Sequence, residues 1–431
     1  MNANRALSGM RTHRHVGLAV AATIAIVAAL LSAWLTPRGP ITTTDALISL
    51  VAAIGVGMAG GVISGRRWSA LVMPVTFVLV FELARRGIEG PTVDGIHLGS
   101  MYGIIAFVLG RGLHGLLVLA PMTIAALYGA VLSLSGPGRR RRVFGPAGWA
   151  TTGILIVVLT GMVVALARPA RTPPIYGADG EALAGSITEL TTVRIGGHDQ
   201  ALMIRGRSVD NPVLLYLAGG PGGTDLGAMR ADTSLEQDFM VATWDQRGAG
   251  KSYEALDPTE TLTLKQTVSD TVELTNYLRE RFAKDRIYLV GNSWGTTLGV
   301  LAAQQSPELY HAFVATGQMV SQRETDIMFW EDTLEWAEQT GRESLADTLR
   351  RNGPPPYDSL FKYEPALSHE HEWNPYAELD PGKEMPFNLF VPENTLMDRF
   401  NGFRGFLDTF SVLYPQLQGI DFRNDVPYLD I

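Results

Sequence analysis

Residues 16–36 (VGLAVAATIAIVAALLSAWLT) form an uncharged apolar run, which constrains the fold of this chain more than any other feature. The run has the length that a helix needs to cross the hydrocarbon core of a bilayer. A cleaved signal peptide is the alternative, since arginines precede the run. Further apolar runs favour a permanent first span, and they cover roughly residues 44–64, 68–84, 115–135 and 148–167. The sequence therefore predicts a membrane domain of about five transmembrane helices over residues 1–168.

One further apolar stretch, residues 98–110 (LGSMYGIIAFVLG), is short, and Arg111 and His114 follow it. A stretch of this length is typical of an interfacial or re-entrant helix. We therefore expect it to form a separate short helix, although a sixth span is the alternative. The glycines of 53–61 (AIGVGMAGG) are expected to form a packing surface between helices.

Charge divides the chain into two parts. The first 170 residues contain 14 arginines, no lysine and only four acids, whereas the whole chain has a net charge of −8. The remainder is therefore strongly acidic, as expected of a water-soluble domain joined to a membrane domain. With five spans, arginine lies mainly on the side of the N-terminus, which favours a cytoplasmic N-terminus and an extracytoplasmic soluble domain in the cell membrane. The lipid bilayer is thus an expected partner.

Composition also excludes several functions. The chain has no cysteine, which excludes disulfides, cysteine-ligated metals and a cysteine nucleophile. The soluble part has no basic stripe, so we expect no nucleic-acid partner. The acids within the candidate spans, Asp45 and Glu82, lie near span ends, which favours an anchor over a transporter.

After a proline-rich linker (169–186), residues 187–320 alternate between strand and helix patterns. A hairpin is expected over 187–195 and 200–206, with its turn at Gly196 and Gly197. Buried strands are expected at 212–218, 239–244, 287–290 and 312–318, and helices at 264–283 and 296–305, with a short helix beginning at Ser306. This alternation predicts an α/β fold with a mostly parallel sheet covered by helices on both faces.

From residue 321 to about 420 the pattern changes to acidic, aromatic-rich helical segments separated by prolines. Such an insertion after a core strand is suited to cover a site, so we expect a helical cap. Residues 421–431, which include NDVPYLDI, are expected to begin a further core strand.

The sequence Gly291-Asn292-Ser293-Trp294-Gly295 matches the G-x-S-x-G nucleophile elbow. An apolar strand pattern precedes it and a helix pattern follows, which is the context that this motif requires. The glycines allow the sharp turn that exposes the hydroxyl of Ser293. We therefore expect Ser293 to be a catalytic nucleophile, with Gly291 and Gly295 as structural support.

Two loops after neighbouring strands are the next candidates. The loop Gly219-Gly220-Pro221-Gly222-Gly223 could be a simple turn, but beside an elbow its amides are suited to an oxyanion hole. We expect Gly220 and the backbone of Trp294 to supply the donors, with Gly219 as support. In the loop DQRGAG (245–250), Asp245 and Arg247 are expected to brace the rim of the site through ion pairing, since a phosphate-binding loop requires a glycine at position 245.

The motifs AGGPGG, WDQRGAGKS and GNSWGTTL, in this order, resemble the prolyl iminopeptidase branch of the α/β-hydrolase superfamily. The segment VATGQ fits that branch too, and the resemblance covers about 187–431. It implies a serine nucleophile at Ser293, an oxyanion hole at Gly220 and Trp294, a substrate-selecting cap, no cofactor, no metal, and removal of N-terminal residues from peptides. Ala218 departs from the pattern, since this branch usually has a histidine there.

The rest of the triad is the larger departure, because in this superfamily the acid and then the histidine follow the nucleophile and the cap. After Ser293 come only His311, expected on the helix that leads into VATGQ, and His369 and His371, in the cap. Neither cap histidine is expected to be catalytic, and Asp421, Asp425 and Asp430 are not expected to be the triad acid. We therefore expect this chain to be a C-terminally incomplete, inactive form of the enzyme.

Three functions remain open from the sequence. The first is a membrane-anchored serine aminopeptidase or iminopeptidase that acts on peptides. The second is an esterase or other acyl hydrolase on the same scaffold, acting on small acyl substrates. A carboxylate such as Glu324 or Glu331 near Ser293, able to hold a substrate ammonium, would distinguish the first from the second. The third is a non-catalytic membrane protein that uses the domain for binding.

Overall fold

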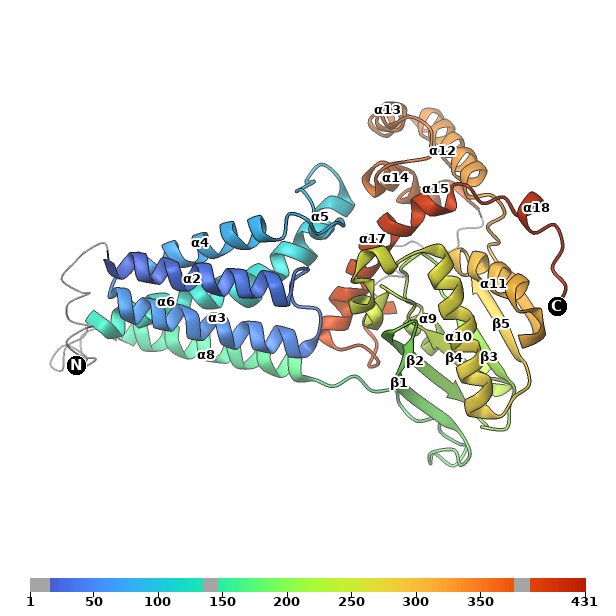
Figure 1. Ribbon diagram of the computed structural model, residues 1–431, viewed down its shortest axis with the longest axis horizontal. Coiled ribbons are helices and arrows are strands. Elements are labelled where there is room, and N and C mark those ends of the chain that lie inside the picture. The colour runs from blue at the N-terminus through green and yellow to red at the C-terminus, as the bar shows by residue number, and fades with distance from the viewer. Residues whose placement is uncertain (1–15, 135–145, 376–387) are drawn as a thin grey trace. The chain divides into compact units, whose positions relative to one another are not determined.

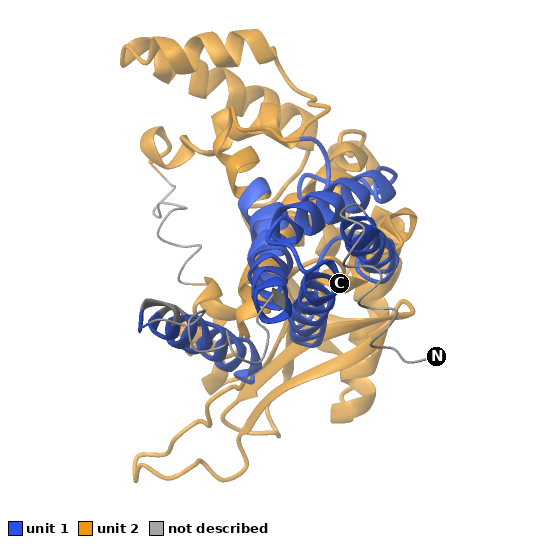
Figure 2. Ribbon diagram, turned by 90° about the vertical axis from the view of Figure 1, so that its left-hand side faces the viewer, with its two compact units in different colours: residues 1–95, 107–169 blue, residues 96–106, 170–431 orange. Residues whose placement is uncertain are grey.

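The computed structural model describes residues 16–134, 146–375 and 388–431. The basic clusters of the first 15 residues and Arg139 to Arg142 lie outside this range. The chain divides into two compact units, which Figure 2 colours separately: residues 1–95 with 107–169, and residues 96–106 with 170–431. Segment 96–106 thus groups with the second unit, although the sequence placed it within the membrane domain.

The first unit consists of apolar helices. They are α2 (Val16–Leu35), α3 (Thr43–Ser64), α4 (Ser69–Ala84), α6 (Ala120–Leu134), which follows π-helical turns η1 (Val108–Gly112) and η2 (Gly115–Leu119), and α8 (Pro146–Ala167). Three described helices are long and apolar enough to cross a membrane, Val16–Leu35, Thr43–Ser64 and Met101–Ser133, and two shorter apolar helices are Ser69–Ala84 and Thr152–Ala167.

The predicted short helix over 98–110 is not separate: helix α5 (Met101–Phe107) runs on into the longer helix Met101–Ser133. The side chains that suggested a helix end are accommodated inside the unit. Arg111 pairs with Glu82 at 3.0 Å and donates to the carbonyl oxygens of Val93 and Asp94. The ring of His114 stacks on Phe81 with centroids 4.4 Å apart. A partnered arginine and a stacked imidazole do not require the helix to end.

The glycines of α3 pack against α6, as the sequence predicted. A Cβ added to Gly57 would lie 2.3 Å from the carbonyl oxygen of Met122, and one added to Gly61 would lie 2.1 Å from that of Ala126. Only residues without a side chain permit helix backbones to approach so closely.

The second unit is built on a six-stranded sheet (Figure 1) with the order β1-β2-β4-β3-β5-β6. The strands are β1 (Ile187–Ile195), β2 (His198–Gly206), β3 (Val213–Leu217), β4 (Met240–Trp244), β5 (Ile287–Asn292) and β6 (Tyr310–Thr316). Strands β3 to β6 pair in parallel, whereas β2 pairs antiparallel with both of its neighbours, β1 and β4, so the sheet is mixed. The β1–β2 turn has Gly196 and Gly197 at φ 55° and 79°, which suits a two-residue hairpin loop.

Helices α10 (Leu264–Phe282) and α11 (Trp294–Gln305) pack against each other and against the sheet, side by side in Figure 1. Thr263 caps the first turn of α10 by accepting from the amide of Gln266. Shorter elements of this core are α9 (Leu226–Ala231) and the 3-10 turns η3 (Leu235–Gln237), η4 (Gly250–Leu256), η5 (Thr259–Thr261) and η6 (Pro307–Leu309). The strand and helix positions in 187–320 thus agree with the sequence prediction to within a few residues.

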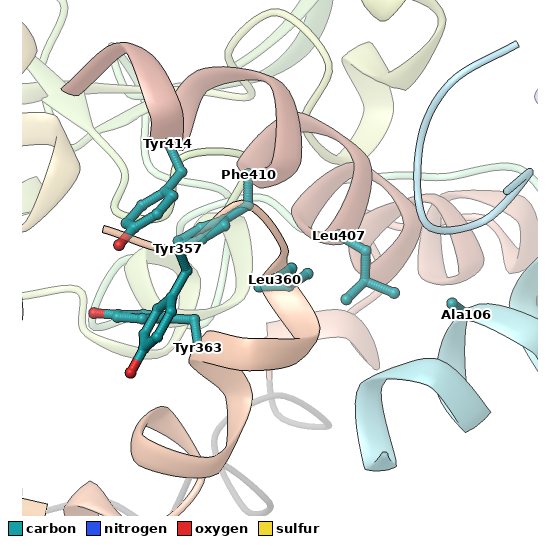
Figure 3. Packing of buried hydrophobic residues seen from close by; sticks show 7 residues of the cluster. All are labelled: Ala106, Tyr357, Leu360, Tyr363, Leu407, Phe410 and Tyr414. Atoms are coloured by element: carbon teal, nitrogen blue, oxygen red, sulfur yellow. The ribbon is translucent and has the colours of Figure 1, made fainter. Parts of the chain in front are cut away.

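The predicted cap region is helical. It comprises α12 (Gln322–Gln339), α13 (Glu343–Asn352), α14 (Leu360–Leu367), α15 (Glu370–Trp373) and α17 (Leu396–Leu417). Tyr414 and Phe410 of α17 stack with ring centroids 5.0 Å apart, and Phe410 stacks on Tyr363 of α14 at 5.7 Å (Figure 3). The cap is therefore held together mainly by aromatic packing.

The strand expected to begin within 421–431 is not formed. Residues Phe422–Asp425 instead form the short helix α18, because the side chain of Asp421 accepts a hydrogen bond from the amide of Arg423 and caps that turn. Only an isolated bridge joins Asp421 to Ser321. Phe422 and Val426 pack with Val300 of α11 in a small apolar cluster.

Candidate active site

Ser293 stands at the turn between β5 and α11. Its backbone has φ 50° and ψ −118°, a conformation that non-glycine residues rarely adopt. The two flanking glycines make the turn possible: a Cβ on Gly291 would lie 2.5 Å from the carbonyl oxygen of Gly295, and one on Gly295 would lie 2.1 Å from that of Leu217. The amide of Ser293 donates to the carbonyl oxygen of Thr316 on β6 at 2.9 Å. The backbone therefore fixes the position of the serine.

The glycine loop after β3 lies beside this turn. A Cβ on Gly219 would lie 3.4 Å from the Cβ of Ser293, and Gly220 has φ 126°, which favours glycine. The amide of Gly223 donates to the carbonyl oxygen of Gly219 at 3.2 Å. Burial raises the pKa of the nearby Asp225, and hydrogen bonds from Tyr216 and the Gly219 backbone oppose that shift. Gly220 and Trp294 line the same cavity as Ser293, and the oxyanion hole expected from their amides stays a prediction.

Gln246 connects the two sides of this arrangement. Its Nε2 donates to the carbonyl oxygen of Ala218 at 3.1 Å, and its Oε1 accepts from the indole Nε1 of Trp294 at 2.9 Å. One buried amide side chain therefore fixes the start of the glycine loop relative to the first residue of α11. Gln246 was not among the site residues predicted from the sequence, and only its place between Asp245 and Arg247 in the WDQRGAGKS motif could have drawn attention to it.

Asp245 and Arg247 are both fully buried but bind different partners. Asp245 accepts from the hydroxyl of Thr224 at 2.5 Å and from the amide of Lys251 at 2.8 Å, and burial raises its pKa to about 6. Arg247 forms a two-point ion pair with Asp270, at 2.8 Å and 3.1 Å, and also donates to the carbonyl oxygen of Gly196 in the β1–β2 turn. The two residues brace the loop but do not pair with each other.

Helix α17 is bonded to the loop that follows β4. The hydroxyl of Thr409 donates to the carbonyl oxygen of Gly248 at 3.0 Å, and the hydroxyl of Tyr253 donates to Asp408 at 2.6 Å. Near the start of the helix, Lys251 pairs with Asp398 and donates to the carbonyl oxygen of Glu393 at 3.1 Å. These contacts seat the cap on the core next to the glycine loop.

A cavity of about 740 Å³ lies over Ser293, within the range of ligand pockets. Gly220, Pro221, Ser293 and Trp294 form its core side, and its other walls are mainly aromatic and aliphatic. Among the described residues that line it, the one carboxylate is Glu370. Glu324 instead pairs with Arg423 at 2.6 Å, and neither it nor Glu331 lines the cavity.

The histidines after Ser293 have separate surroundings. His311 lies on β6, not on the helix that the sequence suggested, and its ring is 5.1 Å from that of Tyr288. His369 Nδ1 is 2.8 Å from the carbonyl oxygen of Pro365. His371 lines the cavity, yet no hydrogen bond joins it to the Ser293 hydroxyl. Within the described ranges, no group of three or more histidine or acidic side chains is arranged to hold a metal.

Comparison with known proteins identifies a hydrolase family with this fold and relatives that are named as aminopeptidases. Residues 212–387 match the family model for the alpha/beta hydrolase fold. A probable aminopeptidase of Bacillus subtilis is 35% identical over 173 residues, which are 40% of this chain and 54% of that protein. A probable proline iminopeptidase of Leptolyngbya boryana is 30% identical over 28% of this chain and 36% of its own length. The matches thus span about half or less of these relatives.

Among solved structures, a proline iminopeptidase-related protein of Thermus thermophilus has 23% identity and a TM-score of 0.31, over 34% of this chain and 50% of that one. The second unit contains an α/β-hydrolase fold with a mixed sheet, matched over residues 212–387, and relatives of the chain include proteins named aminopeptidase and proline iminopeptidase.

Proposed function

We propose that this chain is a membrane-anchored serine hydrolase of the aminopeptidase or iminopeptidase type, with Ser293 as its nucleophile. The observation that carries the proposal is the backbone of Ser293, held at φ 50° between β5 and α11 on the wall of a cavity. Strained backbone of this kind persists where the surrounding structure enforces it, and such positions cluster at active sites.

The chemistry follows from the groups around Ser293. Its Oγ attacks the substrate carbonyl carbon, and the amides of Gly220 and Trp294 stabilise the resulting oxyanion. The C–N bond then breaks as the amine takes up the proton lost by the serine, and the resulting acyl-enzyme is hydrolysed by water to the free acid and the serine hydroxyl. The attack needs a base to accept the serine proton, and we do not assign that role to His371. Because no base is assigned, we expect this chain to have low activity.

Glu370 favours an aminopeptidase over an esterase. A carboxylate on the cavity wall can pair with the ammonium group of a peptide N-terminus, whereas an acyl ester offers no cation. The esterase remains the second candidate, because most of the other cavity walls are apolar and suit a neutral acyl group. The names of the relatives support the first candidate.

Three apolar helices of membrane-spanning length support the anchoring part of the proposal. We place the chain in the cell membrane, with the second unit on the extracytoplasmic side, from the arginine distribution. Labelling the intact cell with a membrane-impermeant lysine reagent tests this orientation: Lys265 and Lys284 of the second unit should react. Reaction only after the membrane is permeabilised would contradict it.

A fluorophosphonate probe tests the nucleophile. We expect slow but measurable labelling of the full chain in detergent, and none in Ser293→Ala. His371→Gln should label at the wild-type rate, and loss of labelling in that variant would identify His371 as the base. A wild-type chain that does not label after prolonged incubation would instead support the non-catalytic binding protein.

Competition with the same probe separates aminopeptidase from esterase. Amino-acid anilides should protect Ser293 from labelling better than short acyl esters do. Glu370→Gln should weaken protection by the anilides about tenfold, the loss expected for one charge-assisted contact, without affecting the esters. Glu331→Gln is the matched control, since Glu331 lies on α12 outside the cavity. Equal protection by both ligand classes would favour the esterase.

A further inference from the structure

Segment 96–106 lies in the sequence between the apolar helices α4 and α6, yet it belongs to the same compact unit as the cap (Figure 2). Three of its residues, Met101, Tyr102 and Ile105, line the cavity that contains Ser293. Nothing in the resemblance to prolyl iminopeptidases covers this part of the chain. The cavity is therefore completed by residues from outside the hydrolase sequence.

A buried carboxylate holds the start of α5 in this position. The amide of Met101 donates to Oε1 of Glu364 on α14 at 3.1 Å. Burial raises the pKa of Glu364, and hydrogen bonds from Met101, Ser100 and Tyr102 oppose that shift. Unpaired amides at a helix start favour a negative charge, so Glu364 caps this helix from another part of the chain.

Packing extends the contact along the segment. Ala106 lies in one buried cluster with Leu360, Tyr363 and Leu407, and Figure 3 shows it beside Leu407. The Tyr102 ring meets Phe406 of α17 edge to face, with centroids 6.1 Å apart. Outside the cavity, the His97 ring lies 4.5 Å from that of Phe361. Ring contacts, a helix cap and a buried alanine make the segment a packed wall.

The chemistry of the wall indicates what it can contact. Tyr102 and Ile105 present an aromatic ring and a branched aliphatic chain, and they face a cavity whose other walls include Phe329, Phe406 and Phe410. Burying an apolar group of a ligand against such surfaces lowers the free energy of the complex. At about 740 Å³ the cavity has room for more than a single small side chain.

We propose that residues 96–106 form a specificity wall of the active site, in which Tyr102 and Ile105 select substrates that carry a bulky apolar group. This inference rests on the proposed function for the type of ligand, an amino-acid amide. It goes further by assigning residues 96–106 as the part of the cavity that selects ligands by size.

Binding to the full chain in detergent tests the wall without requiring turnover, if Ser293→Ala is used as the background. Three ligands are compared: alanine methylamide, which is small, alanine 2-naphthylamide, with a bulky amine, and phenylalanine methylamide, with a bulky side chain. We expect Tyr102→Ala to lower the affinity for at least one bulky ligand about tenfold, corresponding to about 1.4 kcal/mol. The affinity for the small ligand should fall less than twofold. Because each ligand partitions into detergent equally for all variants, the ratio of its affinities for two variants is independent of that partitioning.

His97→Ala is the matched control, because it changes a ring of the same segment that lies outside the cavity, and it should leave all three affinities unchanged. Tyr102→Phe keeps the ring and should bind as the parent does, which separates the wall from misfolding. Tyr102→Trp should narrow the cavity and weaken the bulky ligands alone. The inference is overturned if Tyr102→Ala and Tyr102→Trp both leave the affinity ratios within twofold, or if His97→Ala changes them equally. Absence of Ser293 labelling would count against the proposed function but not against this wall.

Discussion

The two sides of the cavity are held in different ways. On the core side, backbone geometry places Ser293, Gly220 and Trp294: a residue at positive φ, glycines in contact with carbonyl oxygens, and the amide of Gln246 between them. On the cap side, aromatic side chains from α14 and α17 and from segment 96–106 pack on one another. Under the proposed function, we therefore expect the core side to determine reactivity and the cap side to determine which substrate fits.

The largest effect should follow from Gly295→Ala. The new Cβ would lie 2.1 Å from the carbonyl oxygen of Leu217 in β3 and 3.0 Å from that of Ala218, and neither backbone can withdraw without breaking the sheet. We expect a loss of more than about 4 kcal/mol in the free energy of unfolding and loss of Ser293 labelling.

Urea unfolding of the detergent-solubilised chain, followed by tryptophan fluorescence, measures this effect. Gly419→Ala is the matched control, because a Cβ added there would have no heavy atom within 4 Å and its φ is ordinary. It should change stability by less than about 0.5 kcal/mol. Similar stabilities for the two variants would mean that close backbone approach does not hold the core side.

A smaller effect should appear in the pH dependence of stability through Asp245. Burial raises its pKa from 3.8 to about 6, so the folded chain keeps a proton that the unfolded chain has lost between these values. Asp245 therefore stabilises the fold less as pH rises through this window. From pH 4 to 7 we expect wild type to lose about 2–3 kcal/mol relative to Asp245→Asn, which cannot titrate. Parallel stability curves for the two chains would contradict the assignment.

The smallest effect should come from the cap side, in Phe410→Leu. Phe410 is 6% exposed and stacks on Tyr414 and Tyr363, so the smaller side chain should cost about 1–2 kcal/mol. Labelling of Ser293 by a small fluorophosphonate should stay within about twofold of wild type, because the elbow is unchanged. Phe390→Leu, at a ring that is 67% exposed, is the control. A large fall in labelling would show that the cap side also positions the nucleophile.

The sequence predicted the core side well because its determinants are local. The strand before Ser293, the glycines around it and the helix after it lie within one short segment, and the Gly196-Gly197 turn likewise follows from adjacent residues. The cap side depended on contacts between distant parts of the chain. Nothing near Tyr102 indicates that it meets Phe406, about three hundred residues later.

Two errors have different origins. Arg111 and His114 suggested the end of a helix, but Glu82 and Phe81, which lie on another helix, accommodate them. The segment 424–431 (NDVPYLDI) suggested the beginning of a strand, but the capping side chain of Asp421 favours a helical turn at Phe422–Asp425. In the first case partners on another helix decided the structure, and in the second a local cap outweighed the pattern of the following residues.

The bonds between α17 and the loop after β4 restrict how a substrate can enter. Asp398 in the first turn of that helix bonds to Lys251 of the core, and the adjacent Asp408 and Thr409, further along, bond to Tyr253 and Gly248. Moving α17 would break all three contacts at once, so we expect it to stay in place during a reaction cycle. Any opening motion would then involve α12 through α15. In that case α17 would be the fixed side of the entrance to the cavity, and these helices would be its mobile side.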